Sequence, residues 1–178
     1  MPTALTLRDS RADDIAAIAA IYGHWVATGL ASFELEPPDA EEMAKRRAAI
    51  LSAGFPHIVA EGEGGGVLGY AYASAWRPRP AYRFACENSV YVGKDAGRGG
   101  IGRALLEALI ARCTAQGLRL MVAVIGDSAN APSIGLHRAC GFSMVGTLPA
   151  VGWKFDRWVD SVLMTRPLGE GATTPPDR

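Results

Sequence analysis

The sequence predicts an α/β fold of the α+β kind, with one sheet flanked by helices. Two observations support this prediction. Apolar or alternating stretches are separated by glycine turns, as in β-hairpins, and segments with apolar residues at helical spacing interrupt them. The chain has 178 residues, about one domain, and is 49% hydrophobic, which is enough to fill a core. We expect a single domain over residues 1–168 and a disordered tail over 169–178.

The first half of the chain predicts a strand, two helices and a hairpin. Asp13 and Asp14 precede apolar residues at helical spacing, and Gly29 ends that helix. Two prolines and Asp39 start the second helix. The expected elements are strand 5–8, helix 15–26, an extended segment 31–36, helix 39–50, and strands 57–61 and 66–74 joined by a glycine turn. A proline-rich loop over 76–80 follows.

The second half of the chain predicts four more strands and two more helices. The segment 118–125 is apolar enough to be a central buried strand. Polar residues 127–130 precede a helix that Gly141 ends. The expected elements are strand 84–92, helix 101–116, strand 118–125, helix 132–140, strand 142–145 and strand 158–165.

Charge and cysteine content exclude several classes of protein. Lys and Arg together number 18, as do Asp and Glu, so no net charge attracts the chain to a nucleic acid or an acidic membrane. No stretch is long and apolar enough for a membrane span, and the N-terminus does not resemble a signal peptide, so a cytoplasmic protein is expected. Cys86, Cys113 and Cys140 form no CxxC pair, which predicts buried reduced thiols and no metal site.

The most distinctive segment is Gly97-Arg-Gly-Gly-Ile-Gly102, directly before a helix, where glycines allow a phosphate to approach the backbone. A Walker A loop is excluded, because Arg103 and Ala104 follow Gly102 in place of Lys and Ser or Thr. A dinucleotide fingerprint fits the letters of this segment. However, four residues separate it from the preceding strand, and too little chain remains for the rest of that fold.

A third interpretation also uses the neighbouring residues. The segment Glu87-Asn-Ser-Val-Tyr-Val92, followed by Gly97 to Gly102, resembles the GCN5-related N-acetyltransferases (GNAT), whose motif is Gln/Arg-x-x-Gly-x-Gly/Ala. Gly100-Ile-Gly102 matches this motif, while Gly97 replaces its Gln or Arg. Arg98 is expected to supply the missing cation to a pyrophosphate.

Further segments resemble the phosphinothricin and methionine sulfoximine acetyltransferase branch of this family. They are Gly69 to Trp76, Ala81-Tyr82, Val122 to Gly126, Ser133-Ile-Gly-Leu-His137 and Val151 to Trp158. Together with the glycine segment they cover most of residues 5–168. The resemblance implies a GNAT fold with a mixed, mostly antiparallel sheet, acetyl-CoA as co-substrate, a small amino-acid-like amine as substrate, and a homodimer.

The resemblance also implies two catalytic residues. Glu87 falls where the branch has its catalytic carboxylate, which removes a proton from the amine. His137 stands where many GNAT enzymes have a tyrosine that protonates the leaving thiolate. The sequence leaves open whether His137 is an acid, a second base or a residue that orients the substrate.

The remaining site residues are also expectations from the resemblance, beside simpler roles in capping, packing or surface exposure. The expected cofactor contacts are Val90, Tyr91, Val92, Gly97, Arg98, Gly99, Gly100, Ile101, Gly102, Arg103 and Asn130. The expected substrate contacts are Phe33, Ser74, Trp76, Arg77, Tyr82 and Glu87, with Arg79 as an alternative to Arg77. Acetylation of a polyamine or a protein N-terminus, and a non-catalytic acyl-CoA binder, are the alternative functions.

Overall fold

The computed structural model describes residues 5–96 and 99–176. Seven strands form one sheet in the order β1-β2-β3-β4-β5-β7-β6. Neighbouring strands are antiparallel except for β4 and β5, which are parallel. The elements are β1 Thr6–Asp9, η1 Ala12–Asp14, α1 Ile15–Thr28, α2 Ala40–Ser52, β2 His57–Glu61, β3 Val67–Ala75, η2 Pro80–Tyr82, β4 Ala85–Val92, η3 Lys94–Ala96, α3 Ile101–Ala115, β5 Leu120–Gly126, α4 Ala131–Ala139, β6 Ser143–Lys154 and β7 Arg157–Pro167.

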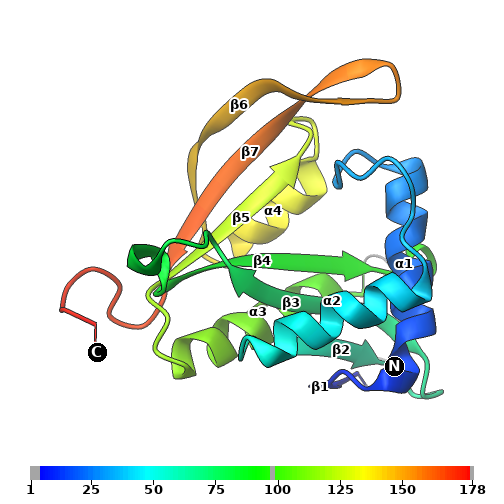
Figure 1. The fold of residues 1–178 in the computed structure, drawn as a ribbon, viewed down its shortest axis with the longest axis horizontal. Helices are drawn as coiled ribbons and strands as arrows, with labels where there is room; N and C mark the ends of the chain where they lie inside the picture. Colours follow the sequence, from blue (N-terminus) through cyan, green and yellow to red (C-terminus); the bar gives the residue numbers. More distant parts are fainter. Residues whose placement is uncertain (1–4, 97–98, 177–178) are drawn as a thin grey trace.

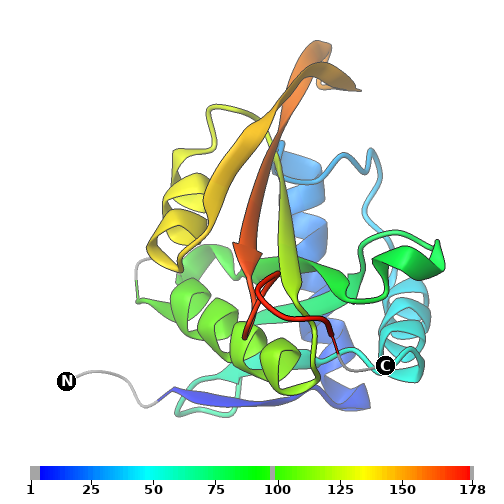
Figure 2. The same cartoon turned by 90° about the vertical axis from the view of Figure 1, so that its left-hand side faces the viewer.

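Helices cover both faces of the sheet (Figures 1 and 2). On one face, α3 and α4 enclose an apolar cluster that contains Leu105, Leu109, Met121 and Met164. On the other face, α1 and α2 enclose a second cluster with many aromatic residues. The mixed α/β class, the mostly antiparallel sheet and the flanking helices predicted from the sequence are confirmed.

Capping residues and glycines in the sequence correctly predicted where several helices begin or end. Gly29 caps α1 and lies outside it. Asp39 accepts a hydrogen bond from the Glu42 N–H and so starts α2, while the Asn130 side chain caps α4 by accepting from the Ser133 N–H. Gly141 has a φ of 83°, the left-handed conformation that ends α4. The predicted hairpin of β2 and β3 is confirmed.

The C-terminal hairpin is much longer than the sequence predicted. The expected strand 142–145 is the start of the twelve-residue β6, which pairs with β7 and projects from the body of the protein (Figure 1). Its register shifts near Gly146 and again between Leu148 and Gly152. These irregularities hid the strand, because Pro149 and two glycines look like a loop in the sequence. The segment 31–36, predicted to be extended, forms bends and no strand.

Cys86, Cys113 and Cys140 are free and buried, as predicted. Residues 169–176 form turns in which Arg119 contacts Glu170 and the main chain of Gly171. Disorder of the tail stays a prediction. Within residues 5–96 and 99–176, no helix is long and apolar enough to cross a membrane.

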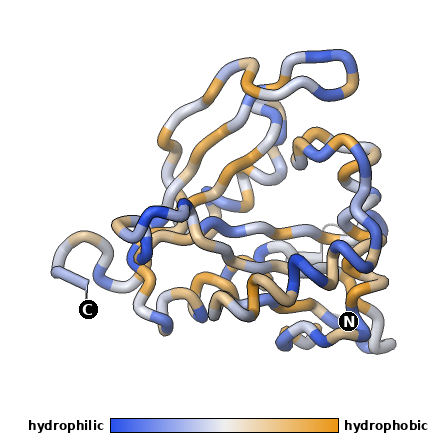
Figure 3. The backbone as a smooth tube through the Cα atoms, in the orientation of Figure 1, coloured by the Kyte–Doolittle hydropathy of each residue, from blue (hydrophilic) through white to orange (hydrophobic). Residues whose placement is uncertain are grey.

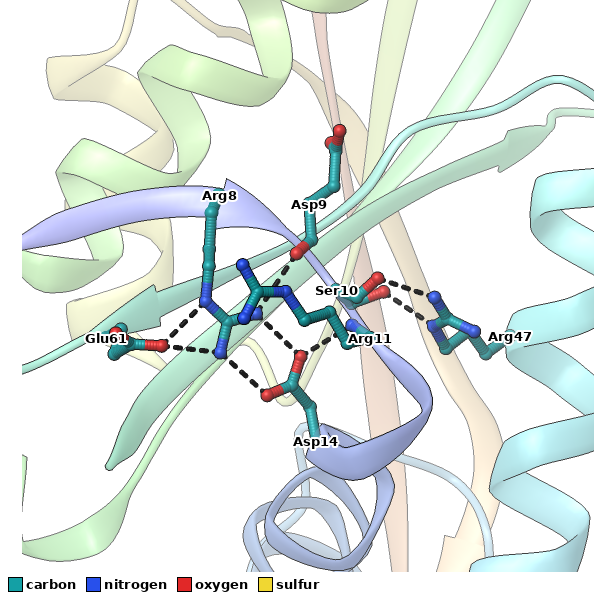
Figure 4. Close-up of polar contacts among 7 residues, drawn as sticks. All are labelled: Arg8, Asp9, Ser10, Arg11, Asp14, Arg47 and Glu61. Atoms are coloured by element: carbon teal, nitrogen blue, oxygen red, sulfur yellow. Dashed lines mark hydrogen bonds and ion pairs between the residues drawn. The ribbon is translucent and has the colours of Figure 1, made fainter. Parts of the chain in front are cut away.

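A polar network joins β1 to its neighbours (Figure 4). The Arg8 guanidinium donates two hydrogen bonds of 2.8 Å to the Asp14 carboxylate, and its Nε donates to Glu61 at 2.6 Å. The Arg47 side chain of α2 donates to the hydroxyl and the carbonyl oxygen of Ser10. The bonds to Arg8 hold the pKa of Asp14 below its ordinary value of 3.8. The network fixes the start of α1 and the position of α2 against the sheet.

The Asp14→Asn substitution should destabilise the fold by about 2 kcal/mol at neutral pH, because it removes charged hydrogen bonds from a buried site. A carboxyl group whose pKa is lowered by folding stabilises the fold at pH values above its ordinary pKa. That stability is lost as the pH falls through the lowered pKa. In urea unfolding, the difference in free energy of unfolding between wild type and variant should therefore become smaller below about pH 4. Asp13→Asn, at an exposed site one residue earlier, is the control. An equal effect of both substitutions would contradict this account.

Candidate active site

The strands β4 and β5 pair over three residues only and then part. Their registered pairs are Ala85 with Leu120, Cys86 with Met121 and Glu87 with Val122. Beyond this point β4 continues beside β3 to Val92, and β5 continues beside β7 to Gly126. Among the described residues, no other strand fills the gap between β4 and β5. The sheet is therefore open along the second half of β4.

Alternate residues of β4 direct their main-chain N–H and C=O groups toward this gap. The Gly93 N–H donates to the Leu68 oxygen, so Val92 and Gly69 form a pair that exchanges no hydrogen bonds. The N–H and C=O groups of Val92 consequently point away from β3, as do those of Val90 two residues earlier. The Trp25 indole already donates to the Val92 oxygen at 2.8 Å. The main-chain groups of Tyr91 face β3 instead.

A small pocket of about 60 Å³ lies in the gap. Its lining comes from β4, β5, α4 and the segment after α1. The lining residues are Ala31, Asn88, Ser89, Val90, Tyr91, Ala123, Val124, Ile125, Gly126, Asn130, Ser133 and His137. Four residues predicted from the sequence, Val90, Tyr91, Asn130 and His137, therefore meet at one place.

Glu87 stands at the closed end of the gap, in the last pair with β5. It also pairs directly with Ser74 of β3, so the two side chains share a face of the sheet. That face carries α1 and α2, since Tyr91, four residues along β4, packs against Tyr22 of α1. Burial raises the pKa of the Glu87 carboxyl above its ordinary value. A carboxylate with a raised pKa is better suited to accept a proton from an amine.

His137 lies on the opposite face of the sheet from Glu87. Successive side chains of a strand alternate between faces, and His137 bonds to Asn88, the residue next to Glu87. His137 is 5% exposed, and its ring packs edge-to-face against Phe142. Burial lowers its pKa, and the contact with the Ser133 oxygen opposes this effect. The two residues predicted to be catalytic thus flank the gap from opposite sides.

The glycine segment leads directly into α3. Gly100 has a φ of 75°, in the left-handed region that favours glycine, and it caps the helix without a side-chain bond. A side chain at Gly102 would contact Leu136 of α4 at 3.4 Å. Arg103 donates to Glu107 one turn along α3. Gly97 and Arg98, both predicted to contact the cofactor, lie outside the described residues, and Gly99 is exposed.

Apart from Phe33, the predicted substrate residues lie near the end of β3, on the connection to β4 or early in β4. Ser74 lies opposite Glu87, and Trp76 follows on the connection to β4. The guanidinium of Arg77 lies 5.2 Å from the Trp76 ring centre. Arg77 is exposed, as are Arg79 and Tyr82 nearby. These cationic and aromatic side chains therefore lie on the surface of the connection between β3 and β4.

Phe33 belongs to a loop held over the end of β5. Carbon atoms added at two glycines would overlap this loop, at 2.2 Å from the Leu30 oxygen for Gly126 and at 2.5 Å from the Phe33 ring for Gly152. The ring therefore fits where these two glycines lack side chains. On the β6–β7 hairpin, the ammonium of Lys154 donates to the Ser32 oxygen at 2.8 Å. The segment after α1 is thus fastened to both β5 and the hairpin.

Sequence reasoning missed four of these positions. Asn88 was not singled out beside Glu87, because it lies between two other polar residues, Glu87 and Ser89, and its partners on β5 and α4 are distant in the sequence. Gly126 directly follows a buried strand, which often marks a close approach of another segment. Gly152 and Lys154 carried no such signal, because their roles depend on contacts with residues more than a hundred positions earlier.

A larger pocket of about 730 Å³ lies elsewhere, between α1, the start of β3 and residues 93–96. It reaches Gly99 and Ile101 but none of the residues predicted to be catalytic or to bind the substrate. We place the site in the smaller gap, because Val90, Tyr91, Asn130 and His137 line it and β4 leaves its strand edge open there, with Glu87 at the point where β4 and β5 part.

Comparison with known proteins places the chain in a family. The model of the acetyltransferase (GNAT) family matches residues 18–142. The chain is 55% identical over 174 residues to phosphinothricin N-acetyltransferase of Alcaligenes faecalis, covering 98% of this chain and 88% of the relative. It is 43% identical over 173 residues to L-methionine sulfoximine/L-methionine sulfone acetyltransferase of Pseudomonas paraeruginosa, covering 96% and 98%.

The fold matches a crystal structure of a phosphinothricin acetyltransferase of Sinorhizobium meliloti in complex with acetyl-CoA. The TM-score is 0.95 at 49% sequence identity, over 100% of this chain and 95% of that one. The chain therefore belongs to the acetyltransferase (GNAT) family and is an N-acetyltransferase.

Proposed function

We propose that the protein transfers the acetyl group of acetyl-CoA to the amino group of a small amino-acid-like substrate. Phosphinothricin, methionine sulfoximine and methionine sulfone are the substrates we expect. The observation that carries the proposal is the parting of β4 from β5 beside the partly buried carboxylate of Glu87. The names of the relatives support the same reaction.

The open edge of β4 suits the extended arm of acetyl-CoA. Unpaired main-chain groups of Val90 and the N–H of Val92 would bind it as a strand edge binds an added strand. The first N–H groups of α3, from Ile101 to Arg103, suit the pyrophosphate, with Gly100 letting the chain turn there. Gly97, Arg98 and Gly99 precede these groups. Asn130 would meet the arm from α4, beside its capping bond.

Glu87 acts as the general base in this proposal. An ammonium has no lone pair, so its proton passes to the carboxylate, directly or through one water. The amine nitrogen then bonds to the thioester carbon, and the carbon–sulfur bond breaks with its electron pair on sulfur. The nitrogen loses its second proton as the amide forms, and this proton passes through water to the sulfur. Because the pKa of the Glu87 carboxyl is raised, it lies closer to the pKa of the amine. His137 lies beside the departing sulfur, on the other side of the gap.

The residues predicted to contact the substrate form its pocket in this proposal. Ser74, Trp76 and Tyr82 line one side, Phe33 the other, and a cation binds the carboxylate or phosphinate. Arg77→Ala or Arg79→Ala should raise KM for the amino acid by about tenfold to a hundredfold, as expected for a lost charged hydrogen bond. Arg83→Ala, in the same connection but with its guanidinium over Phe84, is the control. Unchanged KM in both variants would exclude this role.

We also propose that the protein works as a homodimer in the cytoplasm, without nucleic-acid or membrane partners. The strand β6 lies at the edge of the sheet, and the hairpin exposes large apolar side chains. Hydrophobic and hydrophilic stretches alternate along it (Figure 3). The exposed residues include Val145, Val151, Trp153, Phe155 and Trp158. Sedimentation should give twice the 18.8 kDa mass of the chain, and the mass of one chain would contradict the dimer.

The experiment that tests the function is release of free thiol from acetyl-CoA with a panel of amines. We expect turnover with phosphinothricin, methionine sulfoximine and methionine sulfone, and much less with polyamines or peptides. A preference for polyamines or peptide N-termini would favour the alternative acetyltransferases. Binding of acetyl-CoA without turnover of any amine would indicate a non-catalytic binder.

A further inference from the structure

The side chain of Asn88 lies where β4 and β5 part. It is 5% exposed, and its amide nitrogen donates to the Val122 oxygen of β5 at 3.0 Å. Val122 belongs to the last pair of the parallel ladder. The amide oxygen of Asn88 lies 3.0 Å from Nε2 of His137 on α4. One buried amide therefore joins β4, β5 and α4 at the closed end of the gap.

The orientation of this amide follows from its partners. A carbonyl oxygen can only accept, so the Asn88 nitrogen must face Val122 and the Asn88 oxygen must face His137. The other ring nitrogen of His137, Nδ1, lies 2.8 Å from the Ser133 oxygen. Both ring nitrogens therefore face oxygen acceptors. Only the imidazolium, which carries two N–H groups, can bond to both.

The surroundings of the ring oppose that charge. Its contacts are Ser133 from α4, Asn88 from β4 and Phe142 from the segment before β6, and none of these groups is charged. Glu87 points to the other face of the sheet. Burial lowers the pKa of His137. In the neutral form one ring lone pair faces an oxygen, so a negative charge in the gap would favour uptake of a second proton.

We propose that Asn88 is a positioning residue that prepares His137 to become an imidazolium when negative charge develops on sulfur in the gap. This inference rests on the proposed function, because the sulfur is that of coenzyme A. As the carbon–sulfur bond breaks, the electron pair on sulfur is stabilised through space by the cation. The ring takes its second proton from solvent as the charge on sulfur develops. Both of its N–H groups are then donated, so the proton that the new amide nitrogen loses passes through water to the sulfur, and the ring afterwards returns its proton to solvent.

The test is a pH titration of the histidine rings by NMR in wild type, Asn88→Leu and Asn88→Asp. Loss of the acceptor in Asn88→Leu should lower the pKa of His137 by about one unit. A carboxylate in Asn88→Asp should raise it by about one to three units. The chain has three histidines, so His24 and His57 serve as internal controls. Shifts in the same direction, or none, in two folded variants would overturn the proposal.

A second measurement needs no variant. Addition of coenzyme A to the wild type should raise the pKa of His137, with both ring nitrogens protonated in the complex. An unchanged pKa in a saturated complex would overturn the proposal even if both variants failed to fold. In the dependence of kcat on pH, the limb that reflects the ionisation of His137 should shift to lower pH in Asn88→Leu and to higher pH in Asn88→Asp. A limb that stays in place while the NMR pKa moves would overturn the role in the reaction.

These results separate the inference from the function on which it rests. The titration of the free protein reports on the ring without any turnover. If no amine is acetylated while the pKa shifts in the two variants follow the expected directions, the proposed function fails and the positioning by Asn88 stands. If amines are acetylated and the pKa does not respond to residue 88, the positioning fails and the function stands.

Discussion

Replacing Glu87 with Gln should lower kcat by about 10²-fold to 10⁴-fold while acetyl-CoA still binds. The amide has the size of the carboxyl but cannot take the proton of the substrate ammonium. Thiol release measures the rate, and calorimetry measures acetyl-CoA binding. Burial raises the pKa of Glu87 above 4.5, so wild-type kcat/KM should fall as the pH drops through that raised pKa. This acid limb should disappear in the variant.

The matched control for this variant is Glu63→Gln, in the exposed turn between β2 and β3. It makes the same chemical change away from the gap and should keep the wild-type kcat. Wild-type turnover in Glu87→Gln would remove the carboxylate from the mechanism. A loss of acetyl-CoA binding in parallel with the loss of kcat would show that residue 87 shapes the cleft.

Gly126→Ala should cost about 10²-fold in kcat/KM for the amine, the typical result of shifting a substrate contact by about 1 Å. The added carbon would lie 2.2 Å from the main-chain oxygen of Leu30. The loop that carries Phe33 must therefore move away from β5. Initial rates at varied amine concentration, with acetyl-CoA saturating, measure the effect.

Gly146→Ala is the control for this substitution. It lies in β6, its φ is not positive, and an added carbon would have no neighbour within 4 Å. We expect wild-type kinetics in this variant. If Gly126→Ala and Gly146→Ala both retain wild-type kcat/KM, the loop after α1 does not form part of the substrate pocket.

Elements with local signals could be predicted from the sequence. Asp39, Asn130 and Gly141 mark helix ends through their own side chain or conformation, so α2 and α4 were placed within one or two residues. The hairpin of β2 and β3 follows from a glycine turn between apolar stretches. In each case the determining interaction lies within a few residues of the chain.

Features that depend on distant contacts could not be predicted in this way. The strand β6 runs through Pro149 and two bulges because β7 pairs with it, which the local sequence conceals. Glu87 and His137 were both singled out, but their separation on two faces of the sheet depends on the contact of His137 with Asn88. Phe33 was expected near the substrate, yet its position depends on Gly126 and Gly152 from later strands.

Hydrogen exchange on addition of acetyl-CoA tests the central claim most directly, namely that the gap between β4 and β5 is the acetyl-CoA site. We expect slower exchange in residues 88–92, in the first turn of α3 and in residues 124–131, with little change in β1 and β2. Protection confined to the larger pocket of about 730 Å³ beside α1, with β4 and β5 unchanged, would contradict it.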